Sequence, residues 1–148
     1  MISDTHGMLR QEAVDALAGV KLIIHAGDVG NPEILAQLKQ IAPVFAVRGN
    51  VDTGLWAQEL PLSTVVEAEG ASFYVLHNLR ELDLRADAAK FNFVVSGHTH
   101  QVEQVEKDGV IFLNPGSAGP RRFHLPVTLA ILELSKKPWK ADILTLLP

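Results

Sequence analysis

Two histidines follow an apolar run in the segment Gly97-His98-Thr99-His100. The run itself, residues 91–95, has the composition of a buried strand. Imidazole nitrogens are good ligands for first-row transition ions, and a glycine at the turn lets the backbone approach whatever the rings hold. Exposed loop histidines would give the same pattern, so this segment alone favours a metal site and a plain loop about equally.

Four other apolar runs also end in residues that commonly bind metals. Asp4-Thr5-His6 follows the run at the start of the chain, Gly27-Asp28 follows residues 22–25, Gly49-Asn50 follows residues 44–47, and His77 follows residues 73–76. Any one of these clusters could be an ordinary cap or turn. In open α/β sheets, however, ligands bind outside the carboxyl ends of the strands, so five such ends predict one shared site.

The candidate metal ligands are seven: Asp4, His6, Asp28, Asn50, His77, His98 and His100. That number is too large for one ion and suits two ions with Asp28 between them, the neutral amide of Asn50 adding a donor without adding charge. Two ions about 3.5–4 Å apart can clamp a phosphoryl group. Because the chain has no cysteine, such a site must use nitrogen and oxygen ligands.

Composition limits the class of protein. A chain of 148 residues with 47% hydrophobic and 20% charged residues predicts a single folded domain over residues 1–148. The net charge of -4 and the lack of a basic tract give no evident nucleic-acid footprint. No apolar run approaches the roughly 20 residues that cross a bilayer, and no secretion signal is seen. We therefore expect a soluble protein of the reducing cytoplasm, with no membrane partner.

The order of the expected elements predicts the fold class. A helix over 11–17, a strand over 22–26, a helix that starts with Asn31 as N-cap and Pro32 at its first position, and a strand over 44–47 alternate in the first third. Hairpins follow over 64–76, 101–113 and 127–147, with a helix from about Asp83 to Lys90 and a strand over 91–96. This order predicts an α/β sandwich of two packed sheets with helices outside. The first strand, residues 1–3, is unusually short, or lacks upstream residues.

The ordered motifs resemble those of the calcineurin-like metallophosphoesterases, and most closely their small bacterial and archaeal phosphodiesterase branch. The matching pieces, together with His77, are Asp4-Thr5-His6-Gly7, Gly27-Asp28, Gly49-Asn50-Val51-Asp52, Gly97-His98-Thr99-His100 and Asn114-Pro115-Gly116-Ser117. The resemblance implies a four-layer sandwich of two mixed β-sheets flanked by helices. It also implies two divalent transition-metal ions, with manganese expected first and iron, zinc or nickel as alternatives.

The same resemblance divides the ligands and implies a reaction. One ion would take Asp4, His6, Asp28 and His100, and the other Asp28, Asn50, His77 and His98. Asp28, Asn50 and His98 would act in catalysis through the metals, as a hydroxide bridging the ions attacks a small phosphoester, most simply a phosphodiester. The alternatives are a phosphomonoesterase or pyrophosphatase on the same ions, and a non-catalytic interaction scaffold like the retromer subunit of this fold. A homo-oligomer stays open.

Several residues depart from the family pattern or have two interpretations. Val51 stands where many family phosphatases carry a leaving-group histidine, and Asn78-Leu79 follow His77 where the small branch reads His-Gly-His. We expect His25 to be a hydrogen-bonded structural histidine and Asp52 to cap the turn that follows it. Residues 114–117 either form a plain tight turn or support the ligand backbone. We expect Arg121, Arg122 and His124 to form a solvated surface, with a phosphate contact as the alternative. Trp56 is expected at a core or interface position rather than as a base-stacking platform.

Overall fold

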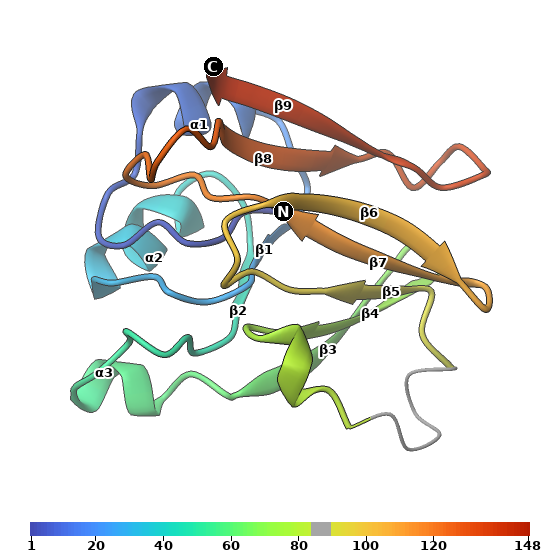
Figure 1. The fold of residues 1–148 in the computed structure, drawn as a ribbon, viewed down its shortest axis with the longest axis horizontal. Coiled ribbons are helices and arrows are strands. Elements are labelled where there is room, and N and C mark those ends of the chain that lie inside the picture. The colour runs from blue at the N-terminus through green and yellow to red at the C-terminus, as the bar shows by residue number, and fades with distance from the viewer. Residues whose placement is uncertain (84–89) are drawn as a thin grey trace.

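The computed structural model describes residues 1–83 and 90–148, and two β-sheets pack face to face in it (Figure 1). The elements run in the order α1 (Gln11–Ala16), β1 (Ile23–His25), α2 (Pro32–Lys39), β2 (Val44–Ala46), α3 (Leu55–Gln58), β3 (Ser63–Ala68), β4 (Ala71–Leu76), η1 (Leu79–Glu81), β5 (Phe93–Val95), β6 (Val102–Lys107), β7 (Val110–Pro115), β8 (Val127–Leu132) and β9 (Ala141–Leu147). The helix expected from Asp83 to Lys90 falls almost entirely outside the described residues. No helix in the described ranges is long and apolar enough to cross a membrane.

The first helices follow local signals in the sequence. The Asn31 side chain accepts a hydrogen bond from the Glu33 N–H, and Pro32 occupies the first turn, as expected for the start of α2. The apolar face of α2 is buried. The short helix α3 was not predicted, because it lacks a side-chain cap and begins after Gly54, whose φ is +96°.

One sheet has five strands in the order β3-β4-β5-β7-β6. Its two hairpins turn at Glu69-Gly70 and Asp108-Gly109, where all four residues have positive φ, as tight hairpin turns require. The strands β4, β5 and β7 are parallel to one another, so the sheet is mixed as predicted. Leu79 of η1 packs on the outer face of this sheet.

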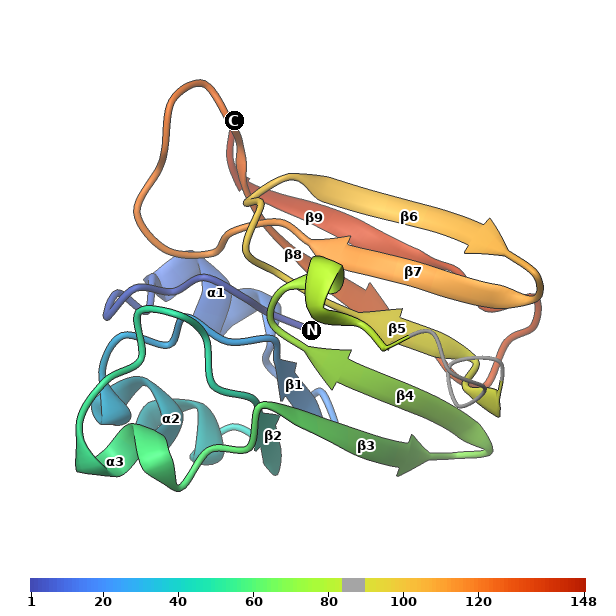
Figure 2. The same ribbon diagram turned by 60° about the horizontal axis from the view of Figure 1, so that its bottom comes forward.

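The second sheet is assembled around the start of the chain. β1 pairs in parallel with β2, and β8 pairs antiparallel with β9. Residues 1–3 lie between these pairs: Ile2 N–H donates to Ile24 O and Ala130 N–H donates to Met1 O. The short first strand is therefore the link that joins the two pairs, and α1, α2 and α3 lie to one side of β1 and β2 (Figure 2).

Two apolar layers hold these parts together. Between the sheets, Val75, Phe93 and Leu113 are almost completely buried. Leu17 and Leu38 fill the layer between the second sheet and the helices. Because the carboxyl ends of β1, β2, β4 and β5 point the same way, the loops that follow them meet at one edge of the molecule.

Candidate metal centre

The seven predicted ligands meet at that edge. Asp4 and His6 follow residues 1–3, Asp28 follows β1, and Asn50 follows β2. The three others, His77 after β4 and His98 and His100 after β5, come from the five-stranded sheet. The two sheets thus contribute to one cluster, and the structure brings all seven side chains together.

Asp4, His6 and His100 form the first group. The Oδ1 atom of Asp4 lies 3.3 Å from His100 Nε2 and 3.8 Å from His6 Nε2. The two Nε2 atoms are 3.2 Å apart, and their rings stack with centroids 5.1 Å apart. One carboxylate oxygen and two imidazole nitrogens therefore face a common point, within 4.8 Å of one another.

Asp28, Asn50, His77 and His98 form the second group. His77 Nε2 lies 3.2 Å from Asp28 Oδ2 and 3.0 Å from Asn50 Oδ1. Asn50 Oδ1 is also 3.1 Å from His98 Nδ1. Asp28 Oδ2 reaches the first group as well, because it lies 3.8 Å from His6 Nε2. Asp28 therefore stands between the two groups, although Asp4 also comes close to Asp28 and His77.

Five of the seven residues have a backbone that L-amino acids adopt rarely. The φ angles are +54° at Asp4, +46° at His6, +53° at Asp28, +72° at His98 and +61° at His100. Each such residue costs on the order of 1–3 kcal/mol and persists only where the surroundings hold it. Hydrogen bonds from Asp4 N–H to Gly27 O and from His6 N–H to Asp28 O provide that restraint. Strain concentrated in these positions singles out the cluster as the candidate functional site.

The side chains fit a cation, as one orphaned atom shows. Among the described residues, the Oδ1 atom of Asp4 is buried without a hydrogen-bond partner. Burial raises the pKa of Asp4 to about 6, above its ordinary value, and lowers the pKa of His100 to about 4. The cluster thus contains an unneutralised carboxylate oxygen and two imidazoles that resist protonation. A divalent ion between them would satisfy all three groups.

The surroundings of His77 indicate that the second group also fits a cation. Its Nδ1 atom lies 2.8 Å from the Ala26 carbonyl oxygen, which can only accept, so Nδ1 bears the proton and Nε2 is left to face two oxygens. Burial lowers the pKa of His77, but the hydrogen bonds to Asp28 and Ala26 outweigh it and raise the pKa overall. The two oxygens that face Nε2 therefore stabilise positive charge on this nitrogen, and they would also stabilise a cation beside it.

Asp52 lies behind the ligands rather than among them. Its carboxylate accepts hydrogen bonds from three backbone N–H groups: Gly30 at 2.7 Å, Gly49 at 2.8 Å and Val29 at 3.2 Å. The expectation that Asp52 caps the turn after it is wrong, since the three donors belong to the loops after β1 and β2. Convergent N–H groups at those loop ends bind the carboxylate, which ties the loop of Asp28 to the loop of Asn50.

Residues 114–117 hold the loop of His98 and His100. Asn114 Nδ2 donates to Gly97 O at 2.8 Å and to Thr99 Oγ1 at 3.1 Å. Ser117 Oγ donates to Asp4 O at 3.0 Å. Of the two interpretations left open for this segment, the structure therefore selects support of the ligand backbone. Gly97 has no room for a side chain, because a Cβ there would lie 2.6 Å from Asp4 Oδ2.

His25 is a structural histidine, as expected. Its Nδ1 accepts from Gly27 N–H at 3.2 Å, and its Nε2 lies 3.0 Å from Thr5 Oγ1. Thr5 gives its only hydroxyl proton to Val29 O, so His25 Nε2 must be the donor in that contact. Sequence reasoning missed Thr5, whose position between two ligands in Asp4-Thr5-His6 was the available signal.

The remaining predicted positions lie at the edge of the cluster or away from it. Arg121, Arg122 and His124 are exposed, as a solvated surface predicts, and the charge of Arg122 helps to lower the pKa of His100. Trp56 is partly buried and packs against the apolar layer under the helices, so it lies at the margin of the core. Val51 is 40% exposed, and its N–H donates to Asp28 Oδ1 at 3.0 Å.

Comparison with known proteins agrees with the motif order. A family model described as the calcineurin-like phosphoesterase superfamily domain matches residues 1–137. A probable metallophosphoesterase from Methanothermobacter thermautotrophicus is 32% identical over 158 residues, covering 97% of this chain and 90% of that protein. A phosphodiesterase from Methanocaldococcus jannaschii is 25% identical over 162 residues, covering 97% of each chain.

Solved structures share the fold. A predicted phosphoesterase from Streptococcus pneumoniae has a TM-score of 0.77 and 28% identity, with 98% of this chain and 87% of that chain covered. An archaeal phosphodiesterase has a TM-score of 0.80 at 24% identity, with 97% of each chain covered. Vps29 of Entamoeba histolytica, in a structure with zinc, has a TM-score of 0.72 at 21% identity, covering 98% and 97%. The last two likenesses establish the fold alone.

Proposed function

The chain belongs to the calcineurin-like phosphoesterase superfamily, and from this premise we propose that it hydrolyses phosphodiesters with two divalent metal ions held by the seven clustered residues. The single observation that carries the proposal is the position of Asp28, whose Oδ2 lies within 3.8 Å of imidazole nitrogens from both groups. A carboxylate so placed can be shared by two ions.

The ligands divide between the ions as the two groups do. Asp4, His6 and His100 would hold one ion, Asn50, His77 and His98 the other, and Asp28 both. When bound, such ions polarise the phosphoryl oxygens and lower the pKa of a water molecule toward neutrality. We expect manganese first, although nitrogen and oxygen ligands also accept iron, zinc or nickel.

The chain's own residues prepare the site for this chemistry. Burial raises the pKa of Asp28, but hydrogen bonds from His77 and from Val51 N–H outweigh it, so the pKa lies below its ordinary value and the carboxylate stays ionised. Ala26 O fixes the His77 tautomer that leaves Nε2 available. Asp28 and His98, both with positive backbone φ angles, already lie within the cluster before any ion binds.

Val51 restricts the leaving group of the proposed substrate. A histidine after the asparagine could protonate a departing alkoxide, whereas the isopropyl group of Val51 has no proton to give. Hydrolysis of esters whose leaving group needs protonation should therefore be slow. A diester with an acidic alcohol or phenol as leaving group avoids this demand.

A second supporting feature is a cavity of about 420 Å³ beside His98, lined also by Asn78, Arg80 and Asn114. It lies next to the metal centre and offers one guanidinium, which can pair with a phosphate oxygen. The second ester substituent of a diester would have room there. The likeness to Vps29 suggests the alternative of a non-catalytic scaffold. Such a scaffold would not need a complete set of seven donors.

The test combines metal content with turnover. Purified protein should bind two ions per chain and hydrolyse an aryl phosphodiester faster than the corresponding aryl phosphomonoester when manganese is added. Asp28→Ala should abolish turnover, while the matched surface variant Asp15→Ala on α1 should keep it. A faster monoester reaction would favour the phosphomonoesterase, and full metal occupancy without hydrolysis of either substrate would favour the scaffold.

A further inference from the structure

Residues 119–126 form a loop that projects from the fold between β7 and β8 (Figure 2). The first residue of this loop is fixed beside the metal ligands. Arg10 Nε donates to Gly119 O at 3.1 Å, and a Cβ at Gly119 would lie 2.5 Å from Asp4 O. The loop therefore leaves the fold in contact with the segment that carries the first ligand.

The tip of this loop is a tight turn. Leu125 N–H donates to Arg122 O at 3.1 Å, which places Phe123 at the first corner of the turn. Phe123 has a φ of +54°, a backbone that costs free energy for a residue with a large side chain. Pro120 and Pro126 restrict the chain before and after the turn. The turn thus presents Phe123 on a restrained backbone.

The side chain of Phe123 lies almost entirely in water. It is 89% exposed, more than any other large apolar side chain in the described part of the chain. An aromatic ring stabilises a protein when it is buried, so this ring contributes little to the stability of the fold. A strained backbone that carries an exposed ring beside a metal centre is the arrangement expected of a binding residue.

The positive charges beside Phe123 are unpaired. Within the described residues, the guanidinium groups of Arg121 and Arg122 are exposed and make no hydrogen bond or ion pair. Burial is the largest cause that lowers the pKa of His100, and the charge of Arg122 is the next. The same charge acts on His6. The Arg122 guanidinium is therefore close enough to the metal centre to act on a substrate bound there.

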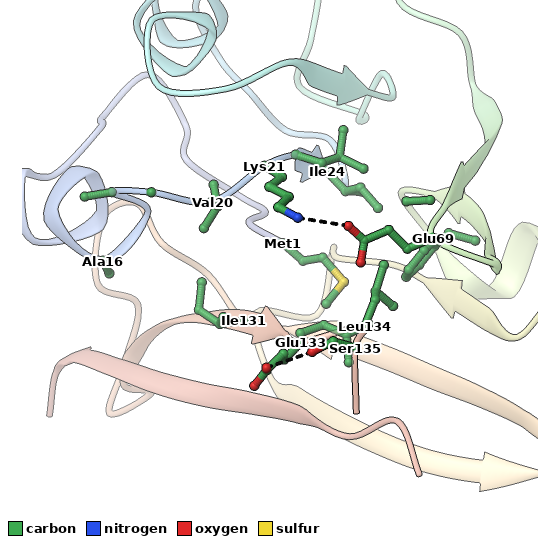
Figure 3. A pocket seen from close by; sticks show the side chains of 16 residues that line it. Met1, Ala16, Val20, Lys21, Ile24, Glu69, Ile131, Glu133, Leu134 and Ser135 are labelled. Atoms are coloured by element: carbon green, nitrogen blue, oxygen red, sulfur yellow. Dashed lines mark hydrogen bonds and ion pairs between the residues drawn. The ribbon is translucent and has the colours of Figure 1, made fainter. Parts of the chain in front are cut away.

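A cavity at the opposite end of β1 differs in this respect. It has a volume of about 550 Å³ and lies beside Met1 and Ile24 (Figure 3). Its walls are mainly apolar, and the Lys21 ammonium at its rim is paired with Glu69 at 3.2 Å. This cavity favours apolar groups, whereas the unpaired guanidinium groups for an anionic group lie in the loop 119–126.

We propose that Arg122 and Phe123 are specificity-determining residues, an inference that rests on the proposed phosphodiesterase function. They select a diester in which one alcohol carries an aromatic ring and a further phosphate. Phe123 stacks on the ring, a contact that any flat aromatic group can make. The planar guanidinium of Arg122 pairs with oxygens of the further phosphate. A nucleotide has both groups within one substituent.

The second substituent of such a diester has a separate place. The loop 119–126 contacts the segment of Asp4, in the first group of ligands, whereas the cavity of about 420 Å³ borders His98, in the second. A phosphoryl group held between the two groups of ligands can therefore direct one substituent to the loop and the other to the cavity.

Three p-nitrophenyl diesters test the two contacts with one leaving group. The other alcohol is ethanol, the 5′-hydroxyl of thymidine, or the 5′-hydroxyl of thymidine 3′-phosphate. In manganese-loaded protein the KM should fall about fivefold to thirtyfold from the first to the second ester, through stacking. It should fall about tenfold more for the third, through the charged contact, while kcat stays within about twofold. Equal KM values would overturn the inference, although turnover of all three would still support the proposed function.

Variants assign each contact to its residue. Phe123→Leu should raise the KM of both thymidine esters at least about fivefold and leave the ethyl ester unchanged, whereas Phe123→Tyr keeps a ring and should keep the KM. Arg122→Gln should raise the KM about tenfold for the 3′-phosphorylated ester alone, and added salt should reduce this difference. The controls Phe45→Leu on β2 and Lys39→Gln on α2, both exposed, should change none of these values. An equal loss of kcat for all three esters in Phe123→Leu would contradict a role in specificity.

A binding measurement separates this inference from the proposed function. Thymidine 3′,5′-bisphosphate, added to chelator-treated protein labelled with ¹⁵N, should shift the amide signals of Arg122 and Phe123 more than that of Phe45. Thymidine alone should shift them less. These shifts without hydrolysis of any ester would contradict the proposed function and still support binding at the loop. No shift at Arg122 and Phe123, or self-association that Phe123→Leu abolishes in place of ligand binding, would overturn the inference.

Discussion

The pKa of His25 offers a quantitative test of the network behind the ligands. His25 accepts from Gly27 N–H and donates to Thr5, so only its neutral form fits. A second proton, on Nδ1, would face the Gly27 N–H. Burial, as the largest cause, lowers the pKa from 6.5 to about 3.

The sign and the size of the effect follow from this shift. Between pH 6.5 and pH 3 the unfolded chain binds the proton and the folded chain does not, so this contribution is complete above pH 6.5 and is lost as the pH falls. At about pH 5, roughly 1.5 pH units below the ordinary pKa of 6.5, the loss is about 2 kcal/mol of the free energy of unfolding.

The assay must separate His25 from other groups. The raised pKa of Asp4 acts in the opposite direction, and the lowered pKa of His100 in the same one. Both effects cancel in the difference between the parent protein and His25→Gln, whose amide nitrogen can still donate to Thr5. In urea unfolding of chelator-treated protein near pH 7, the free energy of unfolding of the His25→Gln variant should be lower than that of the parent by about 1–3 kcal/mol. That deficit should shrink by about 2 kcal/mol near pH 5, and a constant deficit would refute the assignment of a neutral, buried His25.

Other predictions concern the ligands and the groups that hold them. His98→Ala should preferentially empty the ion site of Asn50 and His77, measured by metal content, and equal loss from both sites would contradict the division of ligands. Asp52→Ala should leave three N–H groups without their acceptor and lower the free energy of unfolding by about 2–4 kcal/mol, whereas Asp15→Ala on exposed α1 should change it by less than about 0.5 kcal/mol. Removal of metal with a chelator should lower the thermal midpoint; at free metal of about 100 times its Kd the lost stability is about 2.7 kcal/mol, and an unchanged midpoint would argue against bound ions.

The sequence predicted that the candidate ligands would cluster, because its signals are local. Each ligand follows an apolar run, and the carboxyl ends of parallel strands share an edge, so a linear pattern such as Gly97-His98-Thr99-His100 already carries spatial information. Caps and hairpins, such as Asn31 before α2 and the hairpin over 101–113, are equally local, and their predictions were confirmed. The order of the motifs also placed the chain in its family.

Tertiary structure alone decided the roles of residues whose partners are distant in sequence. Asp52 binds N–H groups up to 23 residues away, and nothing near it in the chain distinguishes this from a local cap. Likewise, the link that Met1 and Ile2 make between β1 and β8 joins Met1 to Ala130. A residue's neighbours along the chain limit its local conformation, but its hydrogen-bond partners and the cavity beside it depend on how separate strands pack. For this reason the meeting of the candidate ligands at one edge could be predicted from the sequence, whereas the groups that support them could not.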